Sequence, residues 1–502
     1  MLNASLSLSP AFVVSPVRPR TFGSFVEHLG RCVYTGLHDP GHPTADEDGF
    51  RQDVIEAVRE LGVTTVRYPG GNFVSGYRWE DGIGPVEQRP ARLDLAWHST
   101  EPNTVGVDEF VRWCRKADVE PMMAVNLGTR GVQESLDILE YCNVPSGTAW
   151  SDLRREHGSE QPHGIRMWCL GNEMDGPWQI GHKTAEEYGR LAAETARAMR
   201  MIDPDLELVA CGSSGSAMPT FGEWERVVLT ESYEHVDYIS AHAYYHEEDG
   251  DLASFLASAM NMDAFIDDVV ATADAVRAAR KLTKRIHISF DEWNVWYIGA
   301  APSEAPKDSW PVAPALLEDH YNVADAVVVG NLLISLLRHS DRVHAASLAQ
   351  LVNVIAPIMT EPGGRLWRQT TFHPFALTAR HAVGEVLEVK LSTPSHETAK
   401  FGDTPLLDAV ATHDPDSGDV AVFVVNRSLT DDATLDVDLR AFGDLRVAEA
   451  LTLANPDPYA RATVDDDTAL APTANATATV DGGAASVVLP PVSWTMVRLT
   501  PA

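Results

Sequence analysis

Residues 165–173 read Ile-Arg-Met-Trp-Cys-Leu-Gly-Asn-Glu, a short, mainly apolar run that ends in Gly171, Asn172 and Glu173. Such a run, bounded by turn-forming residues, is typical of a buried strand. A longer stretch at residues 185–201 follows it, with apolar residues recurring every three to four positions, as in an amphipathic helix. The two segments together predict one βα unit whose strand ends in polar residues.

The same unit recurs from about residue 20 to residue 380. We predict eight strands, at residues 22–28, 63–68, 120–126, 165–170, 206–211, 238–242, 286–291 and 343–350. Helical patterns lie between them, for example at residues 52–61, 107–116, 185–201, 262–281 and 323–337. This alternation predicts an α/β fold with a closed (β/α)8 barrel. An open doubly wound sheet is the alternative, but the GxGxxG pattern typical of its dinucleotide-binding members does not follow the first strand.

The sequence changes character after about residue 380. Short β-rich runs occur at residues 386–391, 407–413, 419–427, 433–439, 447–453, 477–480 and 494–499, with turn signals at 414–418 and 481–483. They predict a C-terminal antiparallel β-sandwich domain over residues 381–502, after a barrel over residues 19–380. Residues 4–14 alternate in part, and we expect the N-terminal segment, residues 1–18, to add a strand to this sandwich. The junction has no Pro-rich or Gly/Ser linker, so we expect the domains to pack together.

Composition excludes several classes of partner. The 502 residues include 72 Asp and Glu against 39 Lys and Arg, and the net charge of −33 disfavours nucleic acid and anionic membranes. The longest mainly apolar stretch, near residues 326–337, is shorter than the roughly 20 residues that span a bilayer and predicts a buried helix. The start of the chain lacks a signal-peptide pattern, and the five cysteines are widely spaced without a CxxC pair, so we expect a reducing, cytoplasmic setting.

Two carboxylates stand at predicted strand ends, where the active site of a (β/α)8 barrel lies. Glu173 follows the fourth strand, and Glu292 follows the seventh in the run Asp291-Glu292-Trp293-Asn294. Their separation of 119 residues corresponds to about three βα units, so both should face one mouth. Two carboxyl groups across a sugar-sized gap can cleave a glycosidic bond. Either residue alone would more often be a helix cap or an ion-pair partner.

At this point a resemblance to a known family becomes specific. The runs around Glu173 and Glu292 resemble the acid/base and nucleophile motifs of retaining glycosidases that carry catalytic glutamates on strands four and seven. Together with residues 25–30, 67–73, 241–245 and 349–354, they make the chain similar to the α-L-arabinofuranosidases of glycoside hydrolase family 51. The resemblance implies an exo-acting, retaining enzyme with Glu173 as acid/base and Glu292 as nucleophile, and we predict carboxyl groups about 5 Å apart.

The resemblance also implies a set of sugar-binding residues, and it leaves some roles open. These residues are Glu27, Asn72, Asn172, Tyr244, Gln350 and Trp296. Arg67 could hold Glu292 ionised or form an ordinary ion pair of the barrel core. His242 is placed as a supporting residue, although a histidine at a strand end is more often structural. Trp97, Trp178 and Trp296 could wall the leaving-group site or simply pack.

Substrate and assembly follow from the resemblance as expectations. The substrates would be oligosaccharides from arabinan and arabinoxylan that carry terminal arabinofuranosyl residues, and the protein would be a homo-oligomer, often a hexamer. No metal-ligand spacing such as HExxH occurs, and we expect neither a metal nor a cofactor. Two alternatives remain: a related endo-β-glucanase, which an open groove would favour, and a non-catalytic carbohydrate-binding barrel, which usually lacks one of the two carboxylates.

Overall fold

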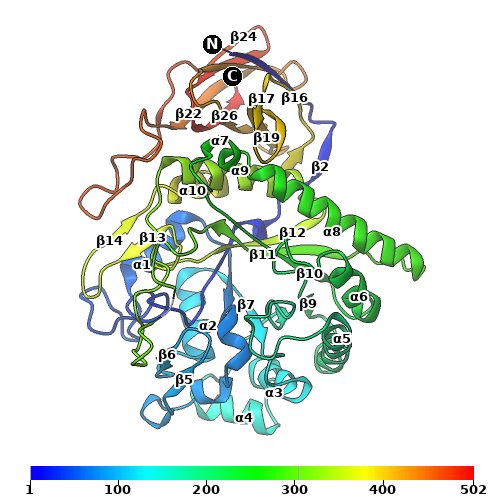
Figure 1. Ribbon diagram of the computed structural model, residues 1–502, viewed down its shortest axis with the longest axis vertical. Coiled ribbons are helices and arrows are strands. Elements are labelled where there is room, and N and C mark those ends of the chain that lie inside the picture. The colour runs from blue at the N-terminus through cyan, green and yellow to red at the C-terminus, as the bar shows by residue number, and fades with distance from the viewer. Residues whose placement is uncertain (1, 304) are drawn as a thin grey trace.

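The computed structural model describes residues 2–303 and 305–502 and contains a closed barrel of eight parallel strands. These strands, in barrel order, are β3 (Gly23–Phe25), β4 (Thr65–Tyr68), β7 (Glu120–Val125), β8 (Met167–Leu170), β9 (Glu207–Ala210), β10 (Tyr238–Tyr245), β11 (His287–Val295) and β12 (Val343–Ala349). They fall at the eight predicted positions, so the barrel is confirmed and the open sheet is excluded. Figure 1 shows the barrel below and the C-terminal domain above it.

The described helices begin and end as follows: α1 (Gln52–Leu61), α2 (Val107–Ala117), α3 (Val132–Asn143), α4 (Ala149–Glu156), α5 (Ala185–Ile202), α6 (Glu223–Ser232), α7 (Leu252–Leu256), α8 (Ala259–Ala279), α9 (Val323–Arg338) and α10 (Phe372–His381). The start of α5 illustrates how the sequence sets such an element. The hydroxyl of Thr184 accepts from the backbone N–H of Glu187, whose carboxylate accepts from the backbone N–H of Thr184. The buried residues Tyr188, Ala192 and Ala196 then recur every four positions and form the face that packs on the barrel.

Two strand predictions are wrong at their carboxyl ends. The seventh strand was expected to end before Glu292, and the sixth at His242, but β11 continues to Val295 and β10 to Tyr245. The pairing shifts register between Phe290 and Trp293, and between Ser240 and His242. Polar residues commonly end a buried strand, but here they continue it because their side chains have buried polar partners. Glu292 therefore lies within a strand, which holds it more rigidly than a loop would.

The C-terminal domain consists of two sheets packed on one core. One sheet has the order β16-β1-β21-β25-β24, and the other has the order β2-β15-β19-β20-β26-β22-β23. The strands are β1 (Leu2–Ser7), β2 (Val13–Pro16), β15 (Glu385–Leu387), β16 (Lys390–Ser392), β19 (Leu407–His413), β20 (Val420–Asn426), β21 (Ala433–Asp438), β22 (Leu445–Leu453), β23 (Thr473–Ala474), β24 (Thr479–Asp481), β25 (Ala484–Leu489) and β26 (Ser493–Pro501). Leu6, Leu435 and Val487 of the first sheet share a buried cluster with Val422 and Leu499 of the second.

The N-terminal segment belongs to this sandwich by its pairing. β1 pairs with β21 and β16, and β2 pairs with β15, so both sheets take up a strand from the start of the chain. The strand predicted over residues 386–391 is in fact two strands, β15 and β16, because the chain crosses there from one sheet to the other. β25 was not predicted. It begins directly after the expected turn at residues 481–483, and buried residues alternate along it.

The two domains pack through the buried helix α9, which contacts β19, β20 and β26. Polar groups cross the interface as well: Asn331 of α9 donates to Asp408 at 2.8 Å and accepts from Arg427 at 2.6 Å. The predicted buried helix at residues 326–337 is therefore confirmed, and its apolar character reflects burial on both sides. Within the described residues, none of the helices has both the length and the apolar character to cross a membrane.

Gly330 in the middle of α9 has no room for a side chain. A Cβ atom there would lie 2.2 Å from Cδ1 of Trp494 in β26. We expect Gly330→Ala to cost about 1–3 kcal/mol in free energy of unfolding by overpacking, more than the roughly 0.5–1 kcal/mol that alanine gains in a helix. Denaturant unfolding measures the change, with Gly41→Ala as control, since a Cβ atom at Gly41 would lie 3.8 Å from Oδ1 of Asp39, which is ordinary van der Waals contact. A variant as stable as the parent would show that the domains are not closely packed here.

A stacked histidine pair lies at the opposite end of the barrel from Glu173 and Glu292. The rings of His287 and His344 have centroids 3.6 Å apart at the starts of β11 and β12. Burial is the main cause that lowers the pKa of both residues from 6.5 to about 4, and the positive charges of Arg18 and Arg342 add to it. Both rings are therefore neutral at neutral pH in the folded protein.

This pair predicts a loss of stability in mild acid. Below pH 6.5 the unfolded chain takes up protons at both histidines, while the folded protein does so only near pH 4, so the free energy of unfolding falls across that window. We expect His344→Gln to lose less stability than the parent between pH 7 and pH 5. Urea unfolding at several pH values measures this, and parallel pH profiles for parent and variant would contradict it.

Candidate active site

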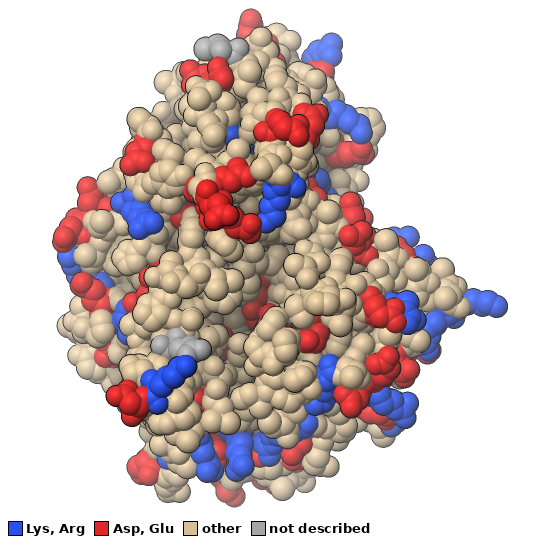
Figure 2. All heavy atoms as spheres, in the orientation of Figure 1, with Lys and Arg blue, Asp and Glu red and all other residues tan. Residues whose placement is uncertain are grey.

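Glu173 and Glu292 reach the same end of the barrel from different strands. Glu173 lies shortly after β8, and Glu292 lies in β11, paired in register with His242 of β10. One carboxylate oxygen of each glutamate and one ring nitrogen of His242 all lie within 4.8 Å of one another. The three side chains line a cavity of about 1170 Å³. Figure 2 shows this face of the molecule hollowed near its centre, with acidic side chains inside the hollow.

Both carboxylate oxygens of Glu292 accept hydrogen bonds from buried donors. Nη1 of Arg67 donates to Oε1 at 2.8 Å, and the hydroxyl of Tyr244 donates to Oε2 at 2.7 Å. Burial raises the pKa of Glu292 above its ordinary value, whereas the positive charges beside it and the Tyr244 donor oppose that shift. The two donors also fix the directions of both oxygens, so this carboxylate cannot turn freely.

Arg67 connects Glu292 to other buried groups. Its Nη2 donates to Oδ1 of Asn172 at 2.6 Å, and its Nε lies 3.9 Å from a carboxylate oxygen of Asp291. The guanidinium also lies over the ring of Phe25, 4.8 Å from the centroid. The two interpretations of Arg67 are therefore compatible, because one side chain both bonds to Glu292 and forms a buried ion pair within the barrel.

The carboxylate of Glu173 is held in a different way. The residue has a φ of 43°, in the left-handed region that few residues other than glycine adopt, and its carbonyl accepts from the N–H of Gly176 at 2.8 Å. Oε1 is 2.8 Å from Nδ1 of His242, and Oε2 accepts from the indole N–H of Trp178 at 2.7 Å. Trp178 is 52% exposed, so the Oε2 side of Glu173 is the side nearer to solvent.

His242 bridges two carboxylates. Nδ1 is 2.8 Å from Glu173, and Nε2 is 2.8 Å from Asp291, which is buried. Burial opposes the charged ring, but the charge of Glu292 and the bonds to the other two carboxylates raise the pKa of His242 well above its ordinary value. Although burial favours the neutral acid, Arg67 and His242 hold the pKa of Asp291 below its ordinary value. An ionised Asp291 therefore orients a charged His242 toward Glu173.

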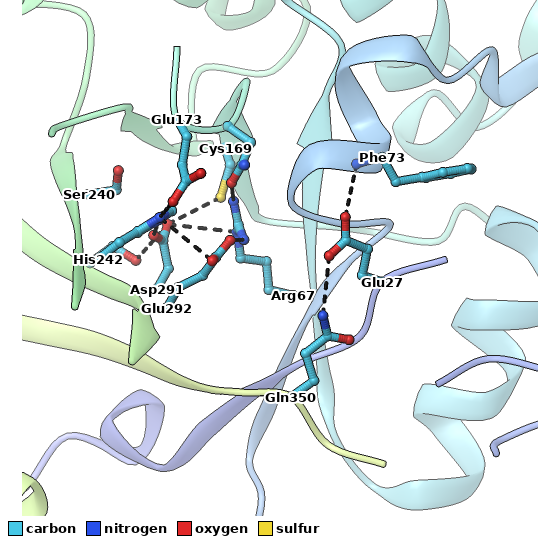
Figure 3. A network of polar contacts seen from close by, with 12 residues as sticks. Glu27, Arg67, Phe73, Cys169, Glu173, Ser240, His242, Asp291, Glu292 and Gln350 are labelled. Carbon is cyan, nitrogen blue, oxygen red and sulfur yellow. Dashed lines mark hydrogen bonds and ion pairs between the residues drawn. The ribbon is translucent and has the colours of Figure 1, made fainter. Parts of the chain in front are cut away.

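Glu27 forms a second group, set apart from this network in Figure 3. Its Oε1 accepts from the backbone N–H of Phe73 and the indole N–H of Trp97, both at 2.9 Å, and its Oε2 accepts from Nε2 of Gln350 at 3.2 Å. Burial raises the pKa of Glu27 to about 8, against the opposing effect of the Phe73 and Trp97 donors. The three partners come from loops after β4 and β12, so they tie neighbouring strand ends together.

Gly70 and Gly71 explain why Glu27 fits there. A Cβ atom on Gly70 would lie 2.6 Å from Cγ of Glu27, and one on Gly71 would lie 2.8 Å from its Oε2. The backbone can approach the buried carboxylate only because both residues lack side chains.

The remaining predicted sugar-binding residues have two kinds of position. Asn72, Tyr244, Gln350 and Trp296 line the cavity, and the rings of Tyr244 and Trp296 meet edge to face with centroids 5.2 Å apart. Asn172 is buried beside Arg67 and is not among the residues that line the cavity. Nδ2 of Asn172 and Oε1 of Gln350 are buried without a hydrogen-bond partner in the described part of the chain. Gln350 lines the cavity, so its Oε1 can still bond to a ligand.

The group of Glu173, His242 and Glu292 has the spacing of possible metal ligands. Each of the three side chains already makes hydrogen bonds, and both ring nitrogens of His242 are engaged by carboxylates. Ligation by His242 would require a free lone pair on one nitrogen and would break one of these contacts. The hydrogen bonds of His242 therefore leave it no free nitrogen for a metal ion while both contacts hold.

Comparison with known proteins identifies the family. The model of the α-L-arabinofuranosidase 1 domain matches residues 57–277, and that of the α-L-arabinofuranosidase C-terminal domain matches residues 291–493. An intracellular exo-α-(1→5)-L-arabinofuranosidase of Streptomyces lividans is 60% identical over 99% of this chain and 75% of the relative. An exo-α-(1→6)-L-arabinofuranosidase of Bifidobacterium longum is 58% identical over 97% of this chain and 95% of the relative.

Solved structures agree with the sequence relatives. A family 51 α-L-arabinofuranosidase from Bifidobacterium longum superposes with a TM-score of 0.95 at 50% identity, over 99% of both chains. The chain belongs to glycoside hydrolase family 51, the α-L-arabinofuranosidases. Another member, from Thermotoga maritima and solved as an arabinose complex, is 34% identical with a TM-score of 0.88, over 99% of both chains. The (1→5) and (1→6) names of the two bacterial relatives show that similar identity in this family accompanies different linkages.

Sequence reasoning missed part of the site of this family 51 member. Asp291 was quoted only as part of a motif, yet it orients His242, and its place directly before Glu292 was the available signal. Trp97 and Trp178 were expected at most as walls, but their indole N–H groups donate to Glu27 and Glu173. No sequence signal pointed to these two bonds, because they depend on the conformation of long loops.

Proposed function

We propose that this chain is an exo-acting, retaining α-L-arabinofuranosidase that releases terminal α-L-arabinofuranosyl residues from arabinan- and arabinoxylan-derived oligosaccharides. The observation that carries the proposal is the close approach of Glu173 and Glu292, with carboxylate oxygens within 4.8 Å in one cavity. Retaining glycosidases have carboxyl groups about 5–5.5 Å apart, whereas inverting ones leave about 6.5–9.5 Å for a water molecule. Family membership supports the same reaction.

In the first step Glu173 acts as the acid and Glu292 as the nucleophile. A carboxylate oxygen of Glu292 attacks the anomeric carbon, and the bond from that carbon to the leaving oxygen breaks as Glu173 gives its proton to the oxygen. The products are an arabinosyl ester of Glu292 and a shortened oligosaccharide with a free hydroxyl group. Arg67 and Tyr244 support this role, because they hold both oxygens of Glu292 in place before the attack.

In the second step Glu173 acts as the base. It takes a proton from water, the water oxygen attacks the anomeric carbon, and the ester bond to Glu292 breaks. Two inversions at one carbon retain its configuration. His242 supports this role, because its ring, held by Asp291, lies 2.8 Å from Oε1 of Glu173 and fixes the direction of that carboxyl group.

Glu27 and its partners support an exo mode of action. Trp97 and Gln350 both donate to Glu27, so three loops form one hydrogen-bonded wall on that side of the cavity. A wall there leaves room for a terminal sugar and blocks a chain that continues past it. Gln350 retains a free oxygen in the cavity for a hydroxyl group of that sugar.

Two further expectations rest on family membership. Relatives named intracellular arabinofuranosidases support an intracellular site of action on imported oligosaccharides. We also expect a homo-oligomer, with a hexamer as one form, and Leu93 and Leu95 leave exposed apolar surface that a second copy could cover. Light scattering during gel filtration measures the mass of the assembly, and a monomer at micromolar concentration would contradict this expectation.

Product analysis tests the proposed function. The purified protein is incubated with nitrophenyl α-L-arabinofuranoside, with α-(1→5)- and α-(1→6)-linked arabino-oligosaccharides, and with a β-glucan. We expect arabinose as the first and only small product from the arabinosides and shortening by one residue at a time. Release of internal fragments, or cleavage of the β-glucan in preference to the arabinosides, would instead favour the endo-β-glucanase alternative.

A further inference from the structure

The cavity that holds Glu173 and Glu292 continues well beyond them. Its lining runs from the catalytic residues along the loop after β10, through His246, Glu248 and Asp251, and on to the sandwich domain. There it reaches Ala399, Lys400 and Phe401, at the tip of the hairpin formed by β17 (Ser395–Thr398) and β18 (Gly402–Pro405). Figure 1 shows α7, next to this loop, at the junction of barrel and sandwich. One continuous cavity is therefore lined by both domains.

The hairpin tip is fixed to the barrel. The backbone N–H of Lys400 donates to the hydroxyl of Ser254 at 3.1 Å, and its ammonium group lies 3.2 Å from a carboxylate oxygen of Glu248. Asp251 caps α7 by accepting from the N–H of Ser254 at 3.0 Å. The N–H of Phe401 in turn donates to the hydroxyl of Thr398 at 3.2 Å. These contacts hold Phe401 at a defined position in the cavity wall.

The size of the cavity exceeds what one pentose requires. Pockets of about 300–1,000 Å³ accommodate whole drug-sized ligands, and this cavity measures about 1170 Å³. In the proposed exo mode, Glu27, Trp97 and Gln350 form the wall beside the terminal sugar, so additional sugars extend on the side of the leaving group. We call the part of the cavity lined by His246, Glu248, Asp251, Lys400 and Phe401 the arm; Trp178 and Trp296 line the same cavity.

The chemistry of this arm suits a neutral sugar. Phe401 offers a half-buried aromatic ring, against which the apolar face of a sugar can pack. Ser216 and Asn261, which are hydrogen-bonded to each other at 3.3 Å, offer hydroxyl and amide groups on the barrel side of the arm. Lys400 pairs with Glu248 at 3.2 Å, and the other carboxylates that line this part of the cavity, Asp249 and Asp251, favour a neutral sugar over an anionic ligand.

We propose that this arm is a distal subsite for the leaving-group chain, with Phe401 of the sandwich domain as its aromatic platform. It would bind a neutral pentosyl unit at least two residues beyond the scissile bond. The proposal rests on the proposed arabinofuranosidase activity and adds to it a specificity-determining residue from the second domain. Its consequence is that longer oligosaccharides gain affinity from Phe401, whereas a nitrophenyl arabinoside is too short to reach it.

The test compares substrates of increasing length. kcat/KM is measured for nitrophenyl α-L-arabinofuranoside and for arabinobiose, arabinotriose and arabinotetraose with the parent, Phe401→Ala and Phe401→Tyr. We expect Phe401→Ala to lower the ratio of kcat/KM for the tetraose to that for the nitrophenyl arabinoside about three- to tenfold, mainly through KM. Phe401→Tyr keeps the ring and should restore the ratio. Phe12→Ala, which removes a 60% exposed phenylalanine elsewhere in the sandwich, is the matched control.

Three results would overturn the proposal. These are an unchanged ratio in Phe401→Ala, an equal loss on all substrates, and a failure of Phe401→Tyr to restore the ratio while it folds as stably as the parent. Thermal unfolding of each variant separates a folding defect from a binding defect. If the parent did not hydrolyse the nitrophenyl arabinoside at all, the proposed function would fail, and that result is distinct from the three above.

Discussion

Replacing Glu292 by glutamine is expected to lower kcat by about four orders of magnitude or more on every arabinoside. The amide keeps the size of the side chain and its place between Arg67 and Tyr244, but it cannot form the ester intermediate. The loss should be as large on nitrophenyl arabinosides as on oligosaccharides, because no leaving group removes the need for a nucleophile. Steady-state kinetics with carefully purified variant protein measures it.

Glu388→Gln provides the control for Glu292→Gln. Glu388 is an exposed glutamate of the sandwich that pairs with Lys390 at 3.0 Å, so the same chemical change there should leave kcat within error of the parent. Thermal unfolding shows whether Glu292→Gln is folded. A folded variant with more than a tenth of the parent activity would remove Glu292 from the role of nucleophile.

Replacing Glu173 by alanine is expected to cost an amount that depends on the leaving group. An oligosaccharide hydroxyl is a poor leaving group and needs a proton from Glu173, so kcat/KM for arabino-oligosaccharides should fall by about 10²–10⁴-fold. A dinitrophenolate leaves without a proton, so kcat/KM for a dinitrophenyl arabinoside should change much less. The second step still lacks its base, and the arabinosyl ester of Glu292 should therefore accumulate as a burst of released phenolate.

Azide distinguishes this role from a general structural effect. Azide attacks the ester without giving up a proton, so it should raise the turnover of Glu173→Ala on the dinitrophenyl arabinoside and yield an arabinosyl azide. Glu231→Gln, at an exposed position of α6, should respond to azide as the parent does. An equal loss of kcat/KM on both classes of substrate, with no effect of azide, would contradict the assignment of Glu173.

The barrel could be predicted from sequence because its strands are short, buried and regularly spaced. The run Met167–Leu170 is apolar throughout, which predicts a strand buried on both faces, and all four residues are buried. The carboxyl ends of β10 and β11 could not be placed, because Glu292 and Asn294 are polar yet remain in the strand. Asn294 donates to the carbonyls of Ala349, at the end of β12, and of Ile355, in the loop after it, both at 2.6 Å. No local sequence pattern predicts partners so far away in the chain.

In the candidate site, too, some features could be predicted from the sequence and others could not. The positions of Glu173 and Glu292 follow from the rule that parallel strands present their carboxyl ends at one mouth. The partners of those residues depend on loop conformation: Trp97 is 70 residues away from Glu27, and Trp178 turns back onto Glu173 within a loop. Phe401 lines the cavity because of the way the two domains pack, and no motif in the barrel sequence predicts that packing.

The stereochemistry of the first product tests the central claim most directly. Hydrolysis of nitrophenyl α-L-arabinofuranoside is followed by proton NMR in deuterated buffer, before the released arabinose equilibrates between its anomers. Two displacements through an ester of Glu292 predict that α-arabinofuranose appears first, with the β anomer and the pyranose forms growing in later by mutarotation. If the β anomer appeared first, the reaction would be a single displacement, and the assignment of Glu292 as a nucleophile would be wrong.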